Sequence, residues 1–100
     1  MTLSYEETER LAIQRMELNR RIKAVLIERL GLDMSLDHLT DDQSLFGRGL
    51  GLDSIDALEL VVGVEDMFNV SIYDGDMEVF GSVNKLADYI IDQLGGVPVL

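Results

Sequence analysis

Cysteine is absent from this 100-residue chain, and proline occurs only once. Without cysteine the protein has no disulfide, no thiolate metal site and no thiol nucleophile, so thiol chemistry must use a sulfur brought from outside the sequence. No run of about 18 apolar residues is present, which predicts no membrane insertion. The start of the chain lacks a basic segment followed by an apolar one, and we expect a cytoplasmic protein.

Basic residues are scarce beyond the first third of the chain. The net charge is -11, and residues 31–100 contain only Arg48 and Lys85 as basic groups. Such a negative field repels nucleic acid and anionic membranes and attracts basic protein surfaces. The negative charge is explained equally well if the acidic residues serve only to keep a small protein soluble. The length suits one domain with one modest core, and we expect a monomer.

Helical periodicity dominates the sequence, in four segments: 5–30, 54–68, 74–80 and 83–94. We therefore predict an all-α fold with four helices around one core, a long loop between helices 1 and 2, and a short helix 3. Residues 1–17 have a thinner apolar stripe, so we expect an N-terminal helical extension that frays or forms a separate helix. The main helical domain is then 18–94, and residues 95–100 form a flexible C-terminal tail.

The connections and the second helix lead to more local expectations. Gly31 is placed to end the first helix, and the tetrad 40–43 resembles a capping box that would start a single turn. Gly63 lies mid-helix, where glycine costs about 1 kcal/mol, and it indicates close packing, room for a ligand or a plain weak spot. Ile55 should face outward. The side chains expected in the core from this part of the chain are Leu45, Phe46, Leu50, Leu58, Val61, Val62 and Phe68.

Ser54 is the most informative candidate site. A glycine-rich stretch, 47–51, leads to Asp53 and Ser54 at the start of a helix, where unpaired N–H groups and the helix dipole favour a phosphate. Asp53 is placed to cap that helix. No basic residue lies between Asp53 and Glu78, so the protein offers no cation there. This arrangement suggests a phosphate attachment point, although an Asp-Ser helix cap alone is common.

Two other kinds of site fit the sequence poorly. A serine nucleophile needs a base, but Ser54 is not in a Gly-x-Ser-x-Gly elbow and the single histidine, His38, lies in the loop. A calcium loop starting at Asp74 would need glycine at its sixth position and glutamate at its twelfth. Those positions are Val79 and Lys85, so we predict no metal site and no catalytic residue.

The segment 50–60, Leu-Gly-Leu-Asp-Ser-Ile-Asp-Ala-Leu-Glu-Leu, resembles the signature of the acyl carrier protein family. The similarity continues to Phe68, through Ile72, and into Ser82-Val83 and Ala87-Asp88-Tyr89-Ile90, covering roughly residues 18–94. The resemblance implies that Ser54 carries 4'-phosphopantetheine, taken from coenzyme A by a phosphopantetheinyl transferase. The terminal thiol of this arm would hold an acyl group as a thioester, and the chain itself would not be an enzyme.

The same resemblance assigns surface roles. Asp53, Ile55 and Asp56 match positions that meet the transferase. Partner enzymes with basic docking patches, of the acyl ligase or ketosynthase type, would contact the second helix at Glu59, Val62, Glu65 and Asp66.

This sequence departs from the family pattern in several places. Arg48-Gly49 stands where acidic residues are common, Tyr73 replaces a proline, and Gly63 replaces a small residue such as alanine. These departures suggest a specialised carrier for a dedicated pathway rather than the general fatty-acid one. The resemblance itself implies a carrier of acyl intermediates for partner enzymes of fatty-acid or polyketide-type synthesis. Three alternatives stay open: an amino-acyl or peptidyl carrier, an unmodified acidic protein-interaction module, and a small calcium-buffering protein.

Overall fold

The computed structural model describes residues 4–46, 51–72 and 77–98. Three α-helices account for most of this part of the chain: α1 (Tyr5–Leu30), α2 (Ser54–Phe68) and α3 (Val83–Leu94). Two short 3-10 helices, η1 (Leu36–His38) and η2 (Met77–Phe80), lie in the connections. The all-α prediction is confirmed, as are the bounds expected for the first, second and last helices.

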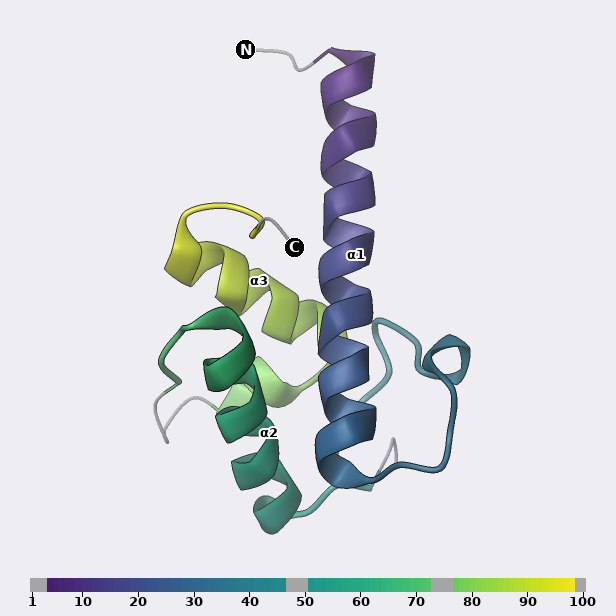
Figure 1. The fold of residues 1–100 in the computed structure, drawn as a ribbon, viewed down its shortest axis with the longest axis vertical. Helices are drawn as coiled ribbons and strands as arrows, with labels where there is room; N and C mark the ends of the chain where they lie inside the picture. Colours follow the sequence, from purple (N-terminus) through teal and green to yellow (C-terminus); the bar gives the residue numbers. More distant parts are fainter. Residues whose placement is uncertain (1–3, 47–50, 73–76, 99–100) are drawn as a thin grey trace.

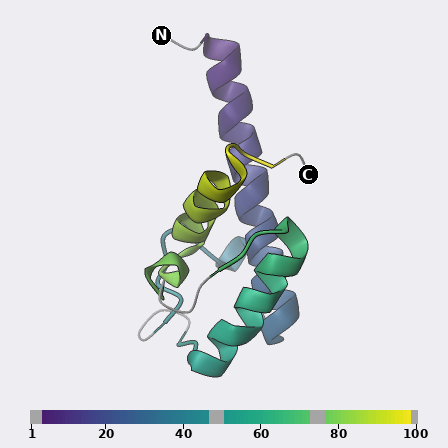
Figure 2. The same cartoon turned by 90° about the vertical axis from the view of Figure 1, so that its left-hand side faces the viewer.

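Helix α1 is the axis of the molecule, and α2 and α3 pack beside its C-terminal half (Figure 1). Its N-terminal half projects beyond them, as the view in Figure 2 also shows. The helix is unbroken from Tyr5, so the separate short helix is wrong, and fraying of the first turns stays a prediction. The Ser4 hydroxyl caps it by accepting a hydrogen bond from the N–H of Glu7 at 3.1 Å, and Gly31 ends it in the left-handed conformation as expected.

Two predicted local elements differ from the structure. The short helix expected over residues 74–80 is a 3-10 helix over Met77–Phe80, closed by a hydrogen bond from the N–H of Gly81 to the Glu78 carbonyl oxygen at 3.0 Å. The first part of that expected helix lies outside the described residues. The tetrad 40–43 starts no helical turn. The Gln43 side chain accepts a hydrogen bond from the N–H of Thr40, but the only turn of helix nearby is η1, which precedes Thr40.

The core lies where the three α-helices and the long loop meet. Its fully buried side chains come from all of these elements: Leu18, Ile22 and Leu26 of α1, Leu39 and Leu45 of the loop, Leu60 and Val64 of α2, Phe80 of η2, and Val83, Leu86 and Ile90 of α3. Leu45 and Phe68 are buried as expected, and Phe46 and Val61 are half-buried against the core. Leu50 lies outside the described residues.

The orientation of α2 contradicts two core predictions. Leu58 is 63% exposed and Val62 is 41% exposed. The inward side of α2 is set by Gly63, because a Cβ there would lie 2.8 Å from Val25 Cγ1 and 2.9 Å from Arg29 Cγ. Of the three explanations offered for Gly63, the structure therefore supports close packing against α1. With Gly63 and Leu60 turned inward, Leu58 and Val62 point to solvent.

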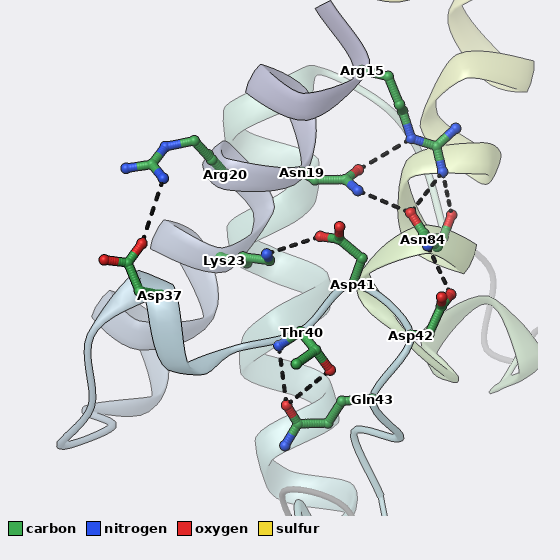
Figure 3. Close-up of polar contacts among 10 residues, drawn as sticks. All are labelled: Arg15, Asn19, Arg20, Lys23, Asp37, Thr40, Asp41, Asp42, Gln43 and Asn84. Atoms are coloured by element: carbon green, nitrogen blue, oxygen red, sulfur yellow. Dashed lines mark hydrogen bonds and ion pairs between the residues drawn. The ribbon is translucent and has the colours of Figure 1, made fainter. Parts of the chain in front are cut away.

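A polar network joins α1, the loop and α3 (Figure 3). The Asn84 side-chain oxygen accepts hydrogen bonds from Asn19 Nδ2 at 2.9 Å and Arg15 Nη2 at 3.2 Å, and its nitrogen donates to Asp42 Oδ1 at 2.7 Å. Lys23 Nζ lies 2.8 Å from Asp41 Oδ1. The loop is thus fastened to two helices by paired polar groups, as well as by Leu39 and Leu45 in the core.

Candidate functional site

Ser54 is the first residue of α2 and is exposed. Figure 1 shows the start of α2 at the end of the molecule opposite the N-terminus of α1. The chain that leads to it is anchored by Leu52, which is buried and whose N–H donates to the Leu45 carbonyl oxygen at 3.1 Å. The serine is therefore held on a fixed helix end while its hydroxyl stays open to a visiting enzyme.

A capping box formed by Asp53 and Asp56 builds the first turn of α2. Asp53 Oδ1 accepts hydrogen bonds from the N–H groups of Ile55 at 3.0 Å and Asp56 at 2.9 Å. In return, the Asp53 N–H donates to Asp56 Oδ2 at 3.1 Å. The predicted cap is confirmed. The N–H groups of Ile55 and Asp56 are therefore already bound, and fewer free amides face a phosphate than the sequence suggested.

The charges around Ser54 are negative. Asp53 and Asp56 flank it, and the ion pairs in the described part of the chain take their basic groups from Arg15, Arg20, Lys23 and Arg29, all on α1. A phosphate held there by charge alone would be repelled. An exposed hydroxyl accepts a covalently attached group without needing a cation, so the site fits a phosphodiester formed by another enzyme, with the phosphate left in solvent.

The single histidine, the candidate base for serine chemistry, contacts a serine other than Ser54 in the described structure. His38 lies in η1, where its Nδ1 is 3.2 Å from Ser35 Oγ. Within the described residues, no group of three or more histidine or acidic side chains could hold a metal ion. The calcium-loop candidate, residues 74–76, lies outside these residues.

The outward face of α2 combines apolar and acidic side chains. Ile55 is 72% exposed, and with Leu58 and Val62 it forms an apolar strip at steps of three and four residues, which one helix face presents together. Glu59 is exposed beside this strip. Ile55 was predicted to face outward, and Leu58 was missed. The signal that could have identified Leu58 is its spacing from Ile55.

Glu65 and Asp66 differ from the other acids predicted on this face. Glu65 is half-buried, and its carboxylate accepts a hydrogen bond from the N–H of Ile72 at 2.9 Å, which holds the segment after α2. Asp66 stays exposed but pairs with Arg29 of α1 at 3.3 Å. Both groups therefore have partners within the protein, whereas the Glu59 carboxylate has none among the residues that the structure describes.

The comparisons with known proteins agree on one family. The sequence model described as "Phosphopantetheine attachment site" matches residues 20–90. Acyl carrier proteins of Thermotoga maritima and Cyanidium caldarium are each 35% identical, over 81% and 78% of this chain and 96% and 87% of their own lengths. The chain belongs to the acyl carrier protein family.

The fold has a solved counterpart in the same family. A holo acyl carrier protein from Nitrosomonas europaea, known from its solution structure, superposes with a TM-score of 0.66 at 23% identity, over 77% of this chain and 95% of that one. Family members are carriers rather than catalysts, and their prosthetic group is a covalently attached 4'-phosphopantetheine. In the described part of this carrier, no helix has both the length and the apolar character needed to cross a membrane. The family match begins after the projecting half of α1.

Proposed function

We propose that Ser54 bears the 4'-phosphopantetheine arm and that the chain carries acyl groups on it, as thioesters, between cytoplasmic enzymes of fatty-acid or polyketide-type synthesis. The observation that carries this proposal is the exposed Ser54 hydroxyl on the capped first turn of α2, inside the region that matches the family. The absence of cysteine agrees with it, since the thiol would arrive with the arm.

The attachment is a phosphoryl transfer made by a separate phosphopantetheinyl transferase. The Ser54 oxygen attacks the phosphorus of coenzyme A that bears the pantetheine. A phosphodiester forms, the pyrophosphate bond breaks, 3',5'-ADP leaves and the serine proton passes to the transferase. Asp53, Ile55 and Asp56 surround the serine and would contact this enzyme. The two carboxylates also keep the helix end in place through their capping hydrogen bonds.

Partner enzymes are proposed to dock on the outward face of α2. The apolar strip of Ile55, Leu58 and Val62 offers area for burial, and Glu59 offers a charge for a basic patch. Asp66 adds a second, partly neutralised charge. Glu65 would act on this face only by holding the segment after α2, because its carboxylate already accepts a hydrogen bond from the N–H of Ile72. Acyl ligases and ketosynthase-type enzymes are the partner classes expected here.

The attachment is tested by incubating the purified chain with coenzyme A, Mg²⁺ and a broad-specificity phosphopantetheinyl transferase. We expect the wild type and the Ser71→Ala variant, which alters another exposed serine, to gain one phosphopantetheinyl group. The Ser54→Ala variant should gain none while keeping its helical circular dichroism. Labelling of Ser54→Ala would refute the assignment. If Ser54→Ala instead kept full activity in the native pathway, an unmodified interaction module would be the better account.

Docking is tested by charge reversal. Glu59→Lys should lower kcat/KM for the transferase and for a loading enzyme, and added salt should reduce the difference between wild type and variant. Asp92→Lys reverses an exposed charge on α3, away from the proposed face, and serves as the matched control. Equal losses in both variants would show that net charge, rather than this face, determines docking.

A further inference from the structure

The projecting half of α1 lies outside the family match, and the polar contacts described between it and the rest of the chain are those of Arg15 with α3. The first buried residue of α1 is Leu18. A few helical turns without tertiary packing are marginal in water. This half nevertheless exposes large apolar side chains: Tyr5 at 82%, Leu11 at 41%, Ile13 at 45% and Met16 at 59%. A partner helix packed on the side of Ile13 and Met16 would bury part of this apolar surface.

The order of charged and apolar residues on one face of α1 indicates which partner would cover it. Glu9, Ile13, Met16 and Arg20 follow one another at steps of four, three and four residues, so all four lie on one face of α1. The order along this face is acid, apolar, apolar, base. All four residues are exposed, and Arg20 makes only a long ion pair, 3.8 Å, with Asp37. This face is its own complement when two copies run in opposite directions.

We propose that two copies of this protein associate through the N-terminal halves of their α1 helices, packed antiparallel. In this register Glu9 lies opposite Arg20 of the second copy, and Ile13 lies opposite Met16 of the second copy. Each contact occurs twice because a twofold axis relates the copies. A parallel arrangement would place Glu9 against Glu9 and Arg20 against Arg20, so charge favours the antiparallel one. The proposal replaces the monomer expected from the sequence.

A groove on α1 lies where the end of the second helix would reach. An open cavity of about 510 Å³ is lined by Glu17, Arg20, Arg21, Ala24 and Leu36, between α1 and η1. The register that pairs Glu9 with Arg20 sets Tyr5 of the second copy opposite Ala24. The small alanine and the half-buried Leu36 leave room there for an aromatic ring. Tyr5, the most exposed large apolar side chain of the described residues, would thus be covered.

The charge distribution of the whole chain permits this contact. Residues 1–30 contain six basic and five acidic groups, whereas residues 31–100 contain two basic and fourteen acidic groups. The α1 contact therefore joins the least acidic parts of the two copies. It leaves the start of α2 at the end of each copy that lies away from the N-terminus of α1 (Figure 1). The contact is small, so the dimer is weak and concentration-dependent.

Sedimentation velocity on the full chain tests the proposal, from low micromolar to near-millimolar protein at physiological salt. The wild type should pass from monomer to dimer within this range. Ile13→Glu should remain monomeric throughout. Leu11→Glu, the matched control, changes a similarly exposed side chain on the opposite side of the same helix and should keep the wild-type dimer. Circular dichroism checks that each variant stays helical.

A charge-swap experiment fixes the register. Glu9→Arg alone and Arg20→Glu alone should each be monomeric, because both contacts then join like charges. An equimolar mixture of the two variants should dimerise, because each contact joins Arg with Glu again. A wild type that stays monomeric, an Ile13→Glu variant that dimerises, or a mixture that stays monomeric would overturn the proposal. Loss of dimer in Leu11→Glu would also overturn the assigned face. None of these variants alters Ser54, so the result is independent of the attachment.

Discussion

Gly63 of α2 lies against Val25 of α1 so closely that a Cβ added to the glycine would be 2.8 Å from Val25 Cγ1. In an open helix, replacing glycine with alanine stabilises by about 1 kcal/mol. Here the methyl group would push apart two packed helices, and such overpacking costs about 1–3 kcal/mol.

Gly63→Ala should therefore lower the free energy of unfolding by about 1 kcal/mol, the difference between these opposing effects. Urea denaturation measures it. Gly96→Ala is the matched control, because a Cβ at Gly96 would have no neighbour within 4 Å. A Gly63→Ala variant as stable as the wild type, or more so, would mean that the two helices separate freely and that their close approach is unimportant.

The cap at Asp53 gives a second prediction. Its carboxylate accepts hydrogen bonds from the N–H groups of Ile55 and Asp56. Asp53→Ala removes both and should destabilise the protein by about 1 kcal/mol in urea denaturation. Asp53→Asn keeps an acceptor oxygen and should lose less. Equal losses in the two variants would indicate that the charge near the helix end, rather than the capping hydrogen bonds, provides the stability.

Asn84 is the centre of the polar network, and its removal should be costly. Asn84→Ala leaves the buried Asn19 side chain without the acceptor that it contacts at 2.9 Å, and an unpaired buried donor costs about 1–3 kcal/mol. Asp42→Ala removes only an exposed partner of the same amide and should change stability by less than about 0.5 kcal/mol. Urea denaturation of both variants decides it. Similar losses would contradict the central role of Asn84.

Asp41 makes stability depend on pH. Lys23, 2.8 Å away, lowers the pKa of the Asp41 carboxyl below its usual value of 3.8. A carboxyl whose pKa is lower in the folded state contributes stability that is present above the unfolded pKa and is lost as pH falls through the folded pKa.

Asp41→Asn should therefore destabilise the protein at neutral pH, and its difference from wild type should shrink once the pH falls below 3.8. Urea denaturation at a series of pH values measures this. Asp37→Asn, which alters the exposed and longer ion pair with Arg20, is the control and should change the free energy of unfolding little. A difference between wild type and Asp41→Asn that stays constant down to acid pH would mean that the Lys23 contact does not hold this carboxyl ionised.

Local signals in the sequence were enough for the three α-helices and for the position of Ser54 at the start of α2. Gly31 and the Asp53 cap mark helix ends by their own backbone and side-chain chemistry, and Ser54 follows directly from the cap. Such features depend on residues adjacent in the sequence, so they can be predicted without knowing how the helices pack. The family signature adds the arm, which no physical feature of the residues specifies.

What the sequence did not reveal depends on how the helices pack. Leu58 and Val62 were predicted in the core, because an apolar-rich helix offers more than one face that could be buried. The position of α1 against Gly63 selects the face. The bond between Glu65 and the N–H of Ile72 was missed for the same reason. Because the chain leaves the helix between Glu65 and Ile72, their spacing in the sequence does not indicate that the two residues form a hydrogen bond.

The most direct test of the central claim is to locate the modification. The chain is produced together with a phosphopantetheinyl transferase, digested, and its peptides are fragmented in the mass spectrometer. Our account predicts one phosphopantetheinyl group per chain, on Ser54, in the peptide that contains Asp53 and Ile55. An unmodified Ser54, or the group found on any other serine, would contradict it.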